Sequence, residues 1–358
     1  MNTIRMAIIG TGGMANGHAQ RLGEESDVKI IACCDVLEEK AKEFAARHSI
    51  PAWYTDYEAL LDKEELDAVS VVTSDVAHAP VSIAALEHGL HVLCEKPMAT
   101  SLEEAKNMVQ AAKAAKKMNM IQFSYRPYPA LERARQLVAE GELGTIRHVE
   151  ASYLQSWLAH SGWGDWRESS ALLWRLSKKH RGGALADLGC HILDFTTYVA
   201  GEIREISFRM KSFDKGMPEN TCKGYVLDAD DSFFATVEFA SGALGVVHST
   251  RWAYGNQNTL RLRVFGDRGA LTIDSDMGKD KLQVCIGEFA GRNALWGTIP
   301  VNVTEESVFQ RFVRSIRTGE PVSPTFEEGL QVQRYLEACK ESGASGKSVR
   351  VDPAEIEE

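Results

Sequence analysis

Two short segments of the chain carry side chains that can move protons or stabilise charge. The first is the tripeptide Glu95-Lys96-Pro97, and the second is a glycine-rich segment, 182–191, that contains Asp187 and His191. We expect the second segment to open a helix, on which residues four apart project from one face. An imidazole, with an ordinary pKa of about 6.5, suits proton transfer, and a lysine ammonium can stabilise negative charge on oxygen. Taken alone, the tripeptide is also typical of a surface segment, and the Asp–His pair of a helical ion pair.

A glycine-rich turn near the N-terminus has the pattern that holds the diphosphate of a dinucleotide. It is Gly10-Thr11-Gly12-Gly13-Met14-Ala15, a G-x-G-x-x-A sequence between an apolar segment and an expected helix. The first glycine permits the tight turn, the second lets the backbone approach a diphosphate, and the small Ala15 lets helix and strand pack closely. Asp35 follows about 20 residues later, where a carboxylate is expected on the adenosine ribose hydroxyls. No arginine adjoins Asp35 to bind a 2′-phosphate, so we predict NAD as the cofactor rather than NADP.

Further cofactor contacts are expected where parallel strands end, because dinucleotides bind at that edge of a sheet. Six residues at or after such ends are predicted to contact the cofactor: Thr73, Ser74, His78, Glu95, Lys96 and Arg126. Thr73 and Ser74 have an alternative role as ordinary helix caps, and a packed or capping role is the more usual one for His78.

The first third of the chain has the pattern of a parallel sheet with helices between its strands. Segments that are apolar almost throughout, as expected of strands covered on both faces, occupy residues 4–9, 28–34, 68–73 and 90–94. Between them lie amphipathic stretches such as 101–117, where Ser101 and Glu104 are predicted to form a capping box. Alternating strands and helices predict a parallel sheet with right-handed crossovers, which we assign to a dinucleotide-binding domain of residues 1–124.

The pattern changes after about Ser124, where the prolines of Tyr125-Arg126-Pro127-Tyr128-Pro129 indicate a linker or a helix start. Longer alternating segments then predict an α+β domain, residues 125–358, built on a large and mostly antiparallel sheet. Four segments are expected to form its hairpins and closing helices: 232–248, 260–273, 305–317 and 327–341. Because these helices do not supply a full layer, we expect one face of the sheet to be open and to pack on another subunit, giving a dimer or tetramer.

The composition limits the partners that the protein can have. With 40 Lys and Arg against 50 Asp and Glu, the formal net charge is −10, which argues against binding of nucleic acid or an anionic membrane surface as the main task. No apolar segment approaches the ~20 residues that span a bilayer, and we find no secretory signal pattern at the N-terminus. The 7 cysteines follow no CxxC pattern, which indicates reduced thiols and a cytoplasmic location. No HExxH or cysteine-rich arrangement supports a metal site.

In this order and spacing, the dinucleotide turn, Glu95-Lys96-Pro97 and the Gly-Gly-x-x-x-Asp-x-Gly-x-His segment resemble the Gfo/Idh/MocA oxidoreductases, named for glucose–fructose oxidoreductase and inositol dehydrogenase. The resemblance covers essentially the whole chain. It implies a Rossmann domain, an α/β domain with an open sheet, and hydride transfer at a secondary alcohol of a sugar, polyol or related ring. It also matches Lys96, Asp187 and His191 to the family's catalytic residues. One departure is Ser74, where many members have proline, and it bears only on local cofactor contacts.

The resemblance leaves two assignments of the catalytic roles of Lys96 and His191 open. In one, His191 takes the hydroxyl proton while the Lys96 ammonium stabilises the alcohol oxygen; in the other, Lys96 is the base and His191 an orienting group. Asp187 either accepts a hydrogen bond from a neighbouring substrate hydroxyl or orients the imidazole. The nicotinamide accepts the hydride.

The substrate side is predicted from an aromatic and basic segment that precedes Asp187. Four of the 7 tryptophans fall in this segment: Trp157, Trp163, Trp166 and Trp174. Indole faces can cover the apolar face of a pyranose, and arginine can donate to hydroxyls or carboxylates. The predicted substrate contacts are Lys96, Tyr125, Trp174, Arg175, Asp187 and His191. A packed loop or a subunit contact is the alternative for this segment. The Trp174-Arg175-x-x-Lys178 run resembles family members that act on glycosides or anhydrosugars.

Three functions are compatible with these features. The leading one is an NAD-dependent dehydrogenase of a sugar, cyclitol or glycoside hydroxyl. A second is an NAD-dependent glycosidase, in which transient oxidation assists the loss of an aglycone. A third is a non-catalytic dinucleotide-binding sensor or regulatory subunit, although a sensor needs no proton-transfer group beside a nicotinamide.

Overall fold

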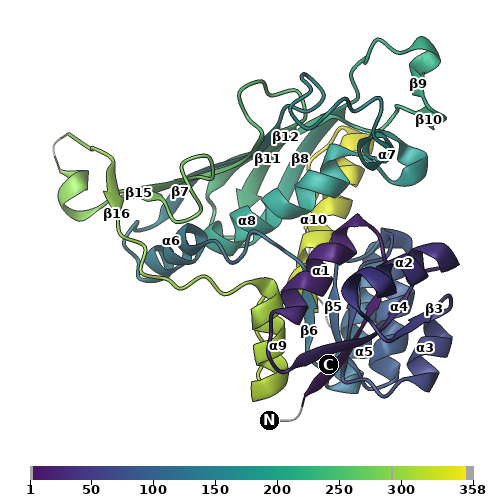
Figure 1. Ribbon diagram of the computed structural model, residues 1–358. Helices are drawn as coiled ribbons and strands as arrows, with labels where there is room; N and C mark the ends of the chain where they lie inside the picture. Colours follow the sequence, from purple (N-terminus) through teal and green to yellow (C-terminus); the bar gives the residue numbers. More distant parts are fainter. Residues whose placement is uncertain (1–2, 292, 352–358) are drawn as a thin grey trace. The chain divides into compact units, whose positions relative to one another are not determined.

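The computed structural model describes residues 3–291 and 293–351 and divides into two compact units (Figure 1). The first unit takes its described residues from Met1–Ser124 and Glu306–Gln333, and the second from Tyr125–Glu305 and Arg334–Glu358. The division after Ser124 lies where the sequence pattern changes. Residues 306–333, in contrast, were expected in the second domain and cluster with the first unit.

The described residues of the first unit form a parallel sheet of six strands in the order β3-β2-β1-β4-β5-β6, which confirms the Rossmann-like fold. Its strands are β1 (Ile4–Ile9), β2 (Val28–Cys34), β3 (Ala52–Tyr54), β4 (Ala68–Val71), β5 (His91–Cys94) and β6 (Asn119–Ile121). The connecting helices are α1 (Gly13–Gly23), α2 (Glu38–His48), α3 (Tyr57–Lys63), α4 (Asp75–Glu87) and α5 (Leu102–Ala115). The strand order reverses between β1 and β4, so their carboxyl ends form the edge where a dinucleotide is expected.

Burial and capping explain why these segments form where they do. β4 is buried along its whole length and β1 nearly so, as expected of strands covered by helices on both faces. At the start of α5, the Ser101 hydroxyl accepts a hydrogen bond from the backbone N–H of Glu104 at 3.2 Å. The buried residues of α5 are Ala105, Met108, Val109 and Ala112. The helix predicted from this apolar spacing is therefore confirmed.

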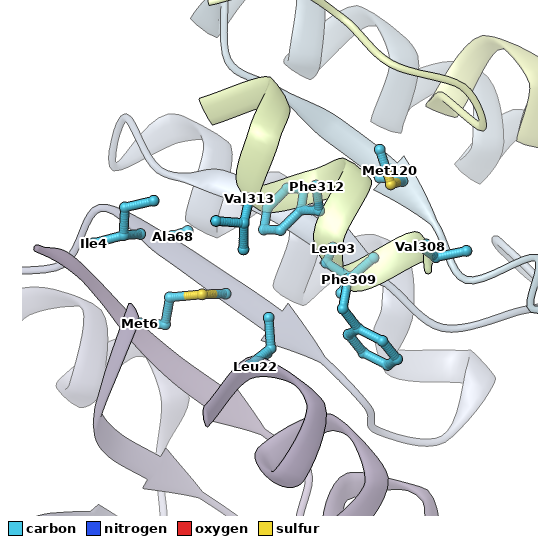
Figure 2. Close-up of a cluster of buried hydrophobic side chains, with 10 residues drawn as sticks. All are labelled: Ile4, Met6, Leu22, Ala68, Leu93, Met120, Val308, Phe309, Phe312 and Val313. Carbon is cyan, nitrogen blue, oxygen red and sulfur yellow. The ribbon is translucent and has the colours of Figure 1, made fainter. Parts of the chain in front are cut away.

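A helix from near the end of the chain completes the core of the first unit. α9 (Val308–Thr318) begins with a capping box between Ser307 and Gln310. Figure 2 shows its apolar side chains packed against those of the sheet and of α1. The cluster comprises Ile4, Met6, Leu22, Ala68, Leu93, Met120, Val308, Phe309, Phe312 and Val313. Burial of this apolar face explains why residues 306–333 join the first unit, although they follow the second in sequence.

The described residues of the second unit form a nine-stranded sheet in the order β16-β15-β14-β13-β7-β12-β11-β8-β17. β7 and β12 pair in parallel and the other neighbours are antiparallel, which confirms the predicted large, mostly antiparallel sheet. The strands are β7 (Ile146–Gln155), β8 (Ile203–Lys211), β11 (Ser232–Phe239), β12 (Leu244–Thr250), β13 (Asn258–Gly266), β14 (Ala270–Asp274), β15 (Leu282–Cys285), β16 (Gly297–Ile299) and β17 (Val349–Arg350). A separate short hairpin joins β9 (Thr221–Cys222) to β10 (Tyr225–Val226).

Helices cover one face of this sheet. α6 (Pro129–Ala139) packs on β14 and β15, and α8 (Cys190–Ala200) packs on β7, β12 and β13 (Figure 1). Two further α-helices of the described residues are the short α7 (Ser170–Leu173) and α10 (Phe326–Ser345), which runs from the first unit into the second. Along β11, Phe233 and Ala235 are buried, whereas Phe234 on the other face is 53% exposed. One face therefore forms the core, and the other carries exposed side chains.

Two properties of the described residues bear on membrane association and redox state. No helix in 3–291 or 293–351 combines the length and the apolar character needed to cross a membrane. All 7 cysteines are buried free thiols. Burial raises the pKa of Cys33 to about 11 and that of Cys34 to about 12, so both thiols stay protonated at neutral pH.

Replacing Phe312 by alanine tests the role of α9 in the first unit. Phe312 is fully buried, so Phe312→Ala leaves a cavity, and we expect the free energy of unfolding to fall by about 3–5 kcal/mol. Urea denaturation followed by circular dichroism measures this change. The matched control is Phe312→Leu, which keeps most of the apolar contact and is expected to cost about 1 kcal/mol. Equal midpoints for the wild type and Phe312→Ala would show that α9 contributes nothing to this core.

Candidate functional site

The dinucleotide turn follows β1 with a backbone conformation that favours glycine. Gly10 has φ = +94°, and its N–H donates to the carbonyl of Cys34 at 2.8 Å. A Cβ at this position would lie 2.5 Å from the carbonyl carbon and oxygen of Val72, so no side chain fits. Gly10 thus holds together the carboxyl ends of β1, β2 and β4.

The next two glycines leave space for a ligand at the N-terminus of α1. A Cβ at Gly12 or Gly13 would meet no protein atom within 4 Å, and the neighbouring Met14 is 62% exposed. Among the described residues no side chain caps this helix, and no acidic residue occupies its first turn. Backbone N–H groups at a helix N-terminus bind phosphate, and the helix dipole favours negative charge there. The turn therefore fits the diphosphate of NAD.

Asp35 follows β2 and is oriented by the turn itself. Its Oδ2 accepts hydrogen bonds from the N–H and the hydroxyl of Thr11 at 3.0 and 2.8 Å, and its Oδ1 accepts from the N–H of Leu37 at 3.0 Å. Burial acts to raise the pKa of Asp35, but these hydrogen bonds outweigh burial and the pKa lies below its ordinary value. The carboxylate is therefore ionised and fixed beside the turn, as binding to ribose hydroxyls requires.

The predicted contacts that follow β4 divide into accessible and buried residues. Ser74 is exposed and Thr73 is half-buried, and no side-chain hydrogen bond from Ser74 caps α4 in the described structure. His78 is 2% exposed, and its ring nitrogens lie 2.8 Å from the carbonyl oxygen of Pro97 and 3.2 Å from that of Thr73. The geometry therefore favours the packed role for His78 over direct contact with a cofactor.

Lys96 follows β5 at the same edge of the sheet as the dinucleotide turn, because β1, β4 and β5 are parallel neighbours. The Glu95 carboxylate is buried; its Oε1 lies 3.0 Å from His18 Nε2, and its Oε2 accepts from the Lys96 N–H at 3.0 Å. The Lys96–Pro97 peptide bond is cis, and Lys96 is half-buried. A lysine is therefore placed at the edge where a nicotinamide cofactor is expected, on a backbone held by Glu95.

In the second unit, the glycine-rich segment forms a π-helical turn, Leu185–Gly189, that continues into α8. The expected helix is thus preceded by a wider turn, a feature frequent at functional sites. Gly189 packs against other side chains: a Cβ there would lie 3.0 Å from Leu185 and 3.6 Å from Leu336 and Phe233. Gly189 therefore lets the protein core pack closely on this turn.

Asp187, within this turn, is held by two arginines. Its Oδ2 accepts hydrogen bonds from Arg175 Nε at 3.1 Å and from Arg251 Nη2 at 3.0 Å. Arg251 is fully buried and also donates to the carbonyls of Arg175 and Gly183. Burial lowers the pKa of Arg251, while the carboxylates of Asp187 and Asp230 act to raise it. Nothing in the sequence pattern singles out Arg251, because its partner lies 64 residues away.

His191 lies in the first turn of α8 among aromatic side chains. It is 7% exposed, and its ring stands edge-on to Tyr125 and Tyr153, with centroid distances of 4.9 and 6.2 Å. The two tyrosine hydroxyls lie 2.6 Å apart and bond the Asn258 side chain at 3.0 and 2.7 Å. Burial raises the pKa of Tyr153 well above its ordinary value, so its hydroxyl keeps its proton. Tyr125 is one of the substrate contacts predicted from the sequence, whereas Tyr153 and Asn258 belong to no motif that would predict them.

Arg126, a predicted cofactor contact, is buried within the second unit. It is 4% exposed, and its Nε and Nη2 donate to the two oxygens of Asp194 at 2.8 and 2.6 Å. Its guanidinium also stacks on the ring of Tyr198 at 4.0 Å. This buried bidentate pair joins the segment after Ser124 to α8, and the cofactor contact expected of Arg126 stays a prediction.

The tryptophan-rich segment divides into core and accessible residues. Trp157 and Trp166 are 1% and 5% exposed and belong to one apolar cluster, so the packed-loop interpretation holds for both. Trp163 is 41% exposed. Trp174 is half-buried, and the Arg175 guanidinium lies 4.6 Å from its ring centroid. Trp174 and Arg175 therefore stay partly accessible next to Asp187.

The predicted residues thus gather in two sets, one in each unit. The glycine turn, Asp35, Thr73, Ser74 and Lys96 lie at the carboxyl ends of the first unit's strands. In the second unit, contacts link Tyr125 to His191 and Arg175 to Asp187. Within the described ranges, no group of three His, Cys, Asp or Glu side chains could hold a metal ion.

Two family models match the chain, and they meet near the division between the units. One, described as an oxidoreductase family with an NAD-binding Rossmann fold, matches residues 4–123. The other, described as a GFO/IDH/MocA C-terminal domain, matches residues 131–272.

Similar proteins extend over nearly the whole chain. It is 30% identical to the levoglucosan dehydrogenase of Pseudarthrobacter phenanthrenivorans, with 90% of this chain and 89% of that protein covered. It is 27% identical to the D-glucoside 3-dehydrogenase of Escherichia coli, with 97% of each covered. A solved structure of levoglucosan dehydrogenase with NADH and levoglucosan has a TM-score of 0.85 at 27% identity, covering 98% of this chain and 100% of that one.

Two single substitutions in the turn, Gly10→Ala and Gly12→Ala, distinguish a glycine needed for folding from one needed for cofactor binding. Gly10→Ala forces a Cβ against the Val72 backbone at a positive φ, so we expect the free energy of unfolding to fall by about 1–3 kcal/mol. Gly12→Ala meets no protein atom and should change stability by less than about 0.5 kcal/mol, but its methyl group enters the diphosphate space. We expect it to weaken NADH binding about tenfold, measured by fluorescence titration. Unchanged NADH affinity of Gly12→Ala would contradict the placement of the diphosphate.

Proposed function

The chain belongs to the Gfo/Idh/MocA oxidoreductase family, and on that premise we propose that it oxidises a secondary hydroxyl of a sugar, cyclitol or glycoside to a ketone. It is an NAD-binding oxidoreductase, as its motifs predicted. The observation that carries the proposal is the position of Lys96 after β5, at the same sheet edge as the dinucleotide turn after β1. There a lysine ammonium can act on an alcohol oxygen next to a bound nicotinamide.

Side chains of the protein accept the substrate hydroxyl proton and stabilise the negative charge that develops on the alcohol oxygen in our proposal. When bound, NAD supplies the hydride acceptor at its nicotinamide. In our proposal His191 takes the hydroxyl proton and the Lys96 ammonium stabilises the alkoxide. The low exposure of His191 and the two tyrosine edges beside it restrict the imidazole's orientation. The reverse division, with Lys96 as the base and His191 as the orienting group, uses the same residues.

We assign Asp187 to a substrate hydroxyl beside the reacting carbon. Arg175 and Arg251 fix its carboxylate in place, which supports a role in positioning. The Arg175 side chain is 28% exposed, so it can donate to a substrate oxygen as well as to Asp187. The indole of Trp174 offers an apolar face for the C–H face of a sugar ring, and the hydroxyl of Tyr125 is a further partner for the substrate.

Relatives narrow the proposed substrate class. Their names refer to levoglucosan and to D-glucosides, and one solved relative holds levoglucosan together with NADH. We propose a ring-closed sugar, glycoside or anhydrosugar for this chain, in preference to a small linear polyol. We also propose that NAD is used in preference to NADP, because the ionised Asp35 would repel a 2′-phosphate.

The proposal is tested by NADH formation across free sugars, inositols, anhydrosugars and glycosides, with NAD and NADP in parallel. We expect turnover with at least one ring-closed sugar and a higher kcat/KM with NAD. Lys96→Met and His191→Asn should each lower kcat by about 100-fold or more and leave the Kd for NADH within about twofold. The matched controls are Lys113→Met, on α5, and His88→Asn, directly after α4; both residues are exposed in the first unit.

Three outcomes would contradict parts of this proposal. Full activity of Lys96→Met or His191→Asn would contradict the catalytic role assigned to that residue. Release of an aglycone without accumulation of NADH would indicate a glycosidase. Tight NADH binding without turnover of any compound in the panel would indicate a sensor.

We also propose that the protein is a cytoplasmic homo-oligomer that buries the uncovered face of its nine-stranded sheet. Phe234 and Leu244 on that face are 53% and 59% exposed, and apolar side chains on a regular sheet face are typical of subunit contacts. Its buried free cysteines suit a reducing compartment. Light scattering should give a mass of two or four chains, and Phe234→Glu should lower it. A monomer at micromolar concentration would contradict the oligomer.

A further inference from the structure

Two buried histidines flank the loop that carries Lys96, and the proton transfer proposed above uses neither of them. His18 lies on α1 and is 1% exposed, and His78 lies on α4 and is 2% exposed. Burying an imidazole costs free energy unless its nitrogens are hydrogen-bonded. In both rings each nitrogen is within hydrogen-bonding distance of a partner, and these partners lie on β4 and on the loops that follow β4 and β5.

On the N-terminal side of Lys96, His18 holds the Glu95 carboxylate. Its Nε2 lies 3.0 Å from Glu95 Oε1, and its Nδ1 lies 2.7 Å from the hydroxyl oxygen of Ser70, which is fully buried on β4. Burial acts to raise the pKa of Glu95, but the hydrogen bond from His18 and the charges of His18 and Lys96 bring it below its ordinary value. An ionised carboxylate only accepts, so His18 Nε2 is the donor. Glu95 Oε2 accepts from the Lys96 N–H, so the chain of bonds ends on the lysine backbone.

On the C-terminal side of Lys96, His78 holds the carbonyl of Pro97. Its Nδ1 lies 2.8 Å from that oxygen, and its Nε2 lies 3.2 Å from the carbonyl oxygen of Thr73. Carbonyl oxygens only accept, so both bonds form only when both nitrogens carry a proton. Burial acts to lower the pKa of His78, but Cys94, the Pro97 carbonyl and Glu95 raise it to about 9. The ring is therefore an imidazolium at neutral pH and donates to both carbonyls.

We infer that His18 and His78 are positioning residues that set where the Lys96 side chain lies relative to the dinucleotide turn. His18 fixes the residue before the lysine, and His78 fixes the residue after it. His78 also binds the carbonyl of Thr73, whose backbone adjoins Gly10. His78 thus bonds the loop after β5, which carries Lys96, to the residue after β4 whose backbone lies against Gly10. The inference rests on the proposed function, because it concerns the position of Lys96.

Displacement of the Lys96 side chain should lower kcat without weakening NADH binding. The dinucleotide turn has its own contacts at Gly10 and Asp35, which His18 and His78 do not touch directly. A misplacement of about 1 Å at a catalytic group can cost about 100-fold in rate. The expected signature is therefore a fall in kcat with an unchanged Kd for NADH. A purely structural role would lower stability and leave kcat of the folded enzyme as it is.

The test compares paired substitutions at each histidine in the full chain. His18→Leu removes the donor to Glu95, whereas His18→Gln keeps an amide N–H at a similar reach; His78→Leu and His78→Gln form the second pair. We expect each leucine variant to lower kcat by about 30- to 100-fold, with the Kd for NADH within about twofold. The kcat of each glutamine variant should be at least about tenfold higher than that of the leucine variant at the same position. NADH titration shows which variants are folded, and His18→Asn replaces His18→Leu if the latter does not fold.

Two further variants distinguish a failure of this inference from a failure of the proposed function. Lys96→Met is measured in the same assay: if it is fully active, the role of Lys96 is wrong, whatever the histidine variants do. If Lys96→Met is inactive while His18→Leu and His78→Leu keep wild-type kcat, the positioning role is overturned. The matched control is His91→Gln, at the opposite end of β5, where the ring accepts from the Met118 N–H at 2.9 Å. Its kcat should stay within about twofold of the wild type.

The charge on His78 adds a measurement that does not depend on catalysis. Its pKa in the folded chain, about 9, lies above the ordinary 6.5, so folding favours the protonated ring. This contribution to stability is complete below about pH 6.5 and is lost as the pH rises through about 9. The thermal midpoint of the wild type should therefore fall more steeply between pH 7 and pH 10 than that of His78→Gln. Parallel curves would show that His78 does not carry the charge that binding both carbonyls requires.

Discussion

The first unit depends on one close contact, the backbone of Gly10 against the carbonyl of Val72. A Cβ at Gly10 would lie 2.5 Å from that carbonyl, and the residue's φ is +94°, so the contact exists only because glycine has no side chain. It draws the ends of β1 and β4 together at the point where the strand order reverses. Asp35 is then fixed by Thr11 of the same turn, and the N-terminus of α1 stays open for a diphosphate.

Buried polar groups hold the loop that carries Lys96 at the same edge of the sheet as the glycine turn. In a low-dielectric interior an unpaired imidazole or carboxylate is costly, so a fully bonded set permits few alternatives. Ser70, His18 and Glu95 form one such set, and His78 with its two carbonyls forms another. These bonds fix the backbone on both sides of Lys96, the residue to which we assign the alkoxide.

In the second unit, buried arginines hold the candidate site residues in place. Arg251 is fully buried and binds the Asp187 carboxylate together with two backbone carbonyls, and Arg126 binds Asp194 in α8. These ion pairs fix the π-helical turn and the start of the helix that carries His191. Aromatic packing by Tyr125 and Tyr153 then orients the imidazole. The tryptophan-rich segment supplies core at Trp157 and Trp166 and a partly accessible surface at Trp174.

Local pattern was enough to predict the buried parallel strands, the glycine turn, the helix capped by Ser101, and the family with its NAD-binding domain. These signals lie within a few residues of one another, where backbone sterics and hydrophobic period act directly. Three features follow from the packing of distant segments: Arg126 is buried against Asp194, α9 joins the first unit, and Arg251 binds Asp187. His18 and its partner Glu95 are 77 residues apart in the sequence, and Arg251 and Asp187 are 64 residues apart. Such partners are chosen by packing of distant segments, which no local spacing records.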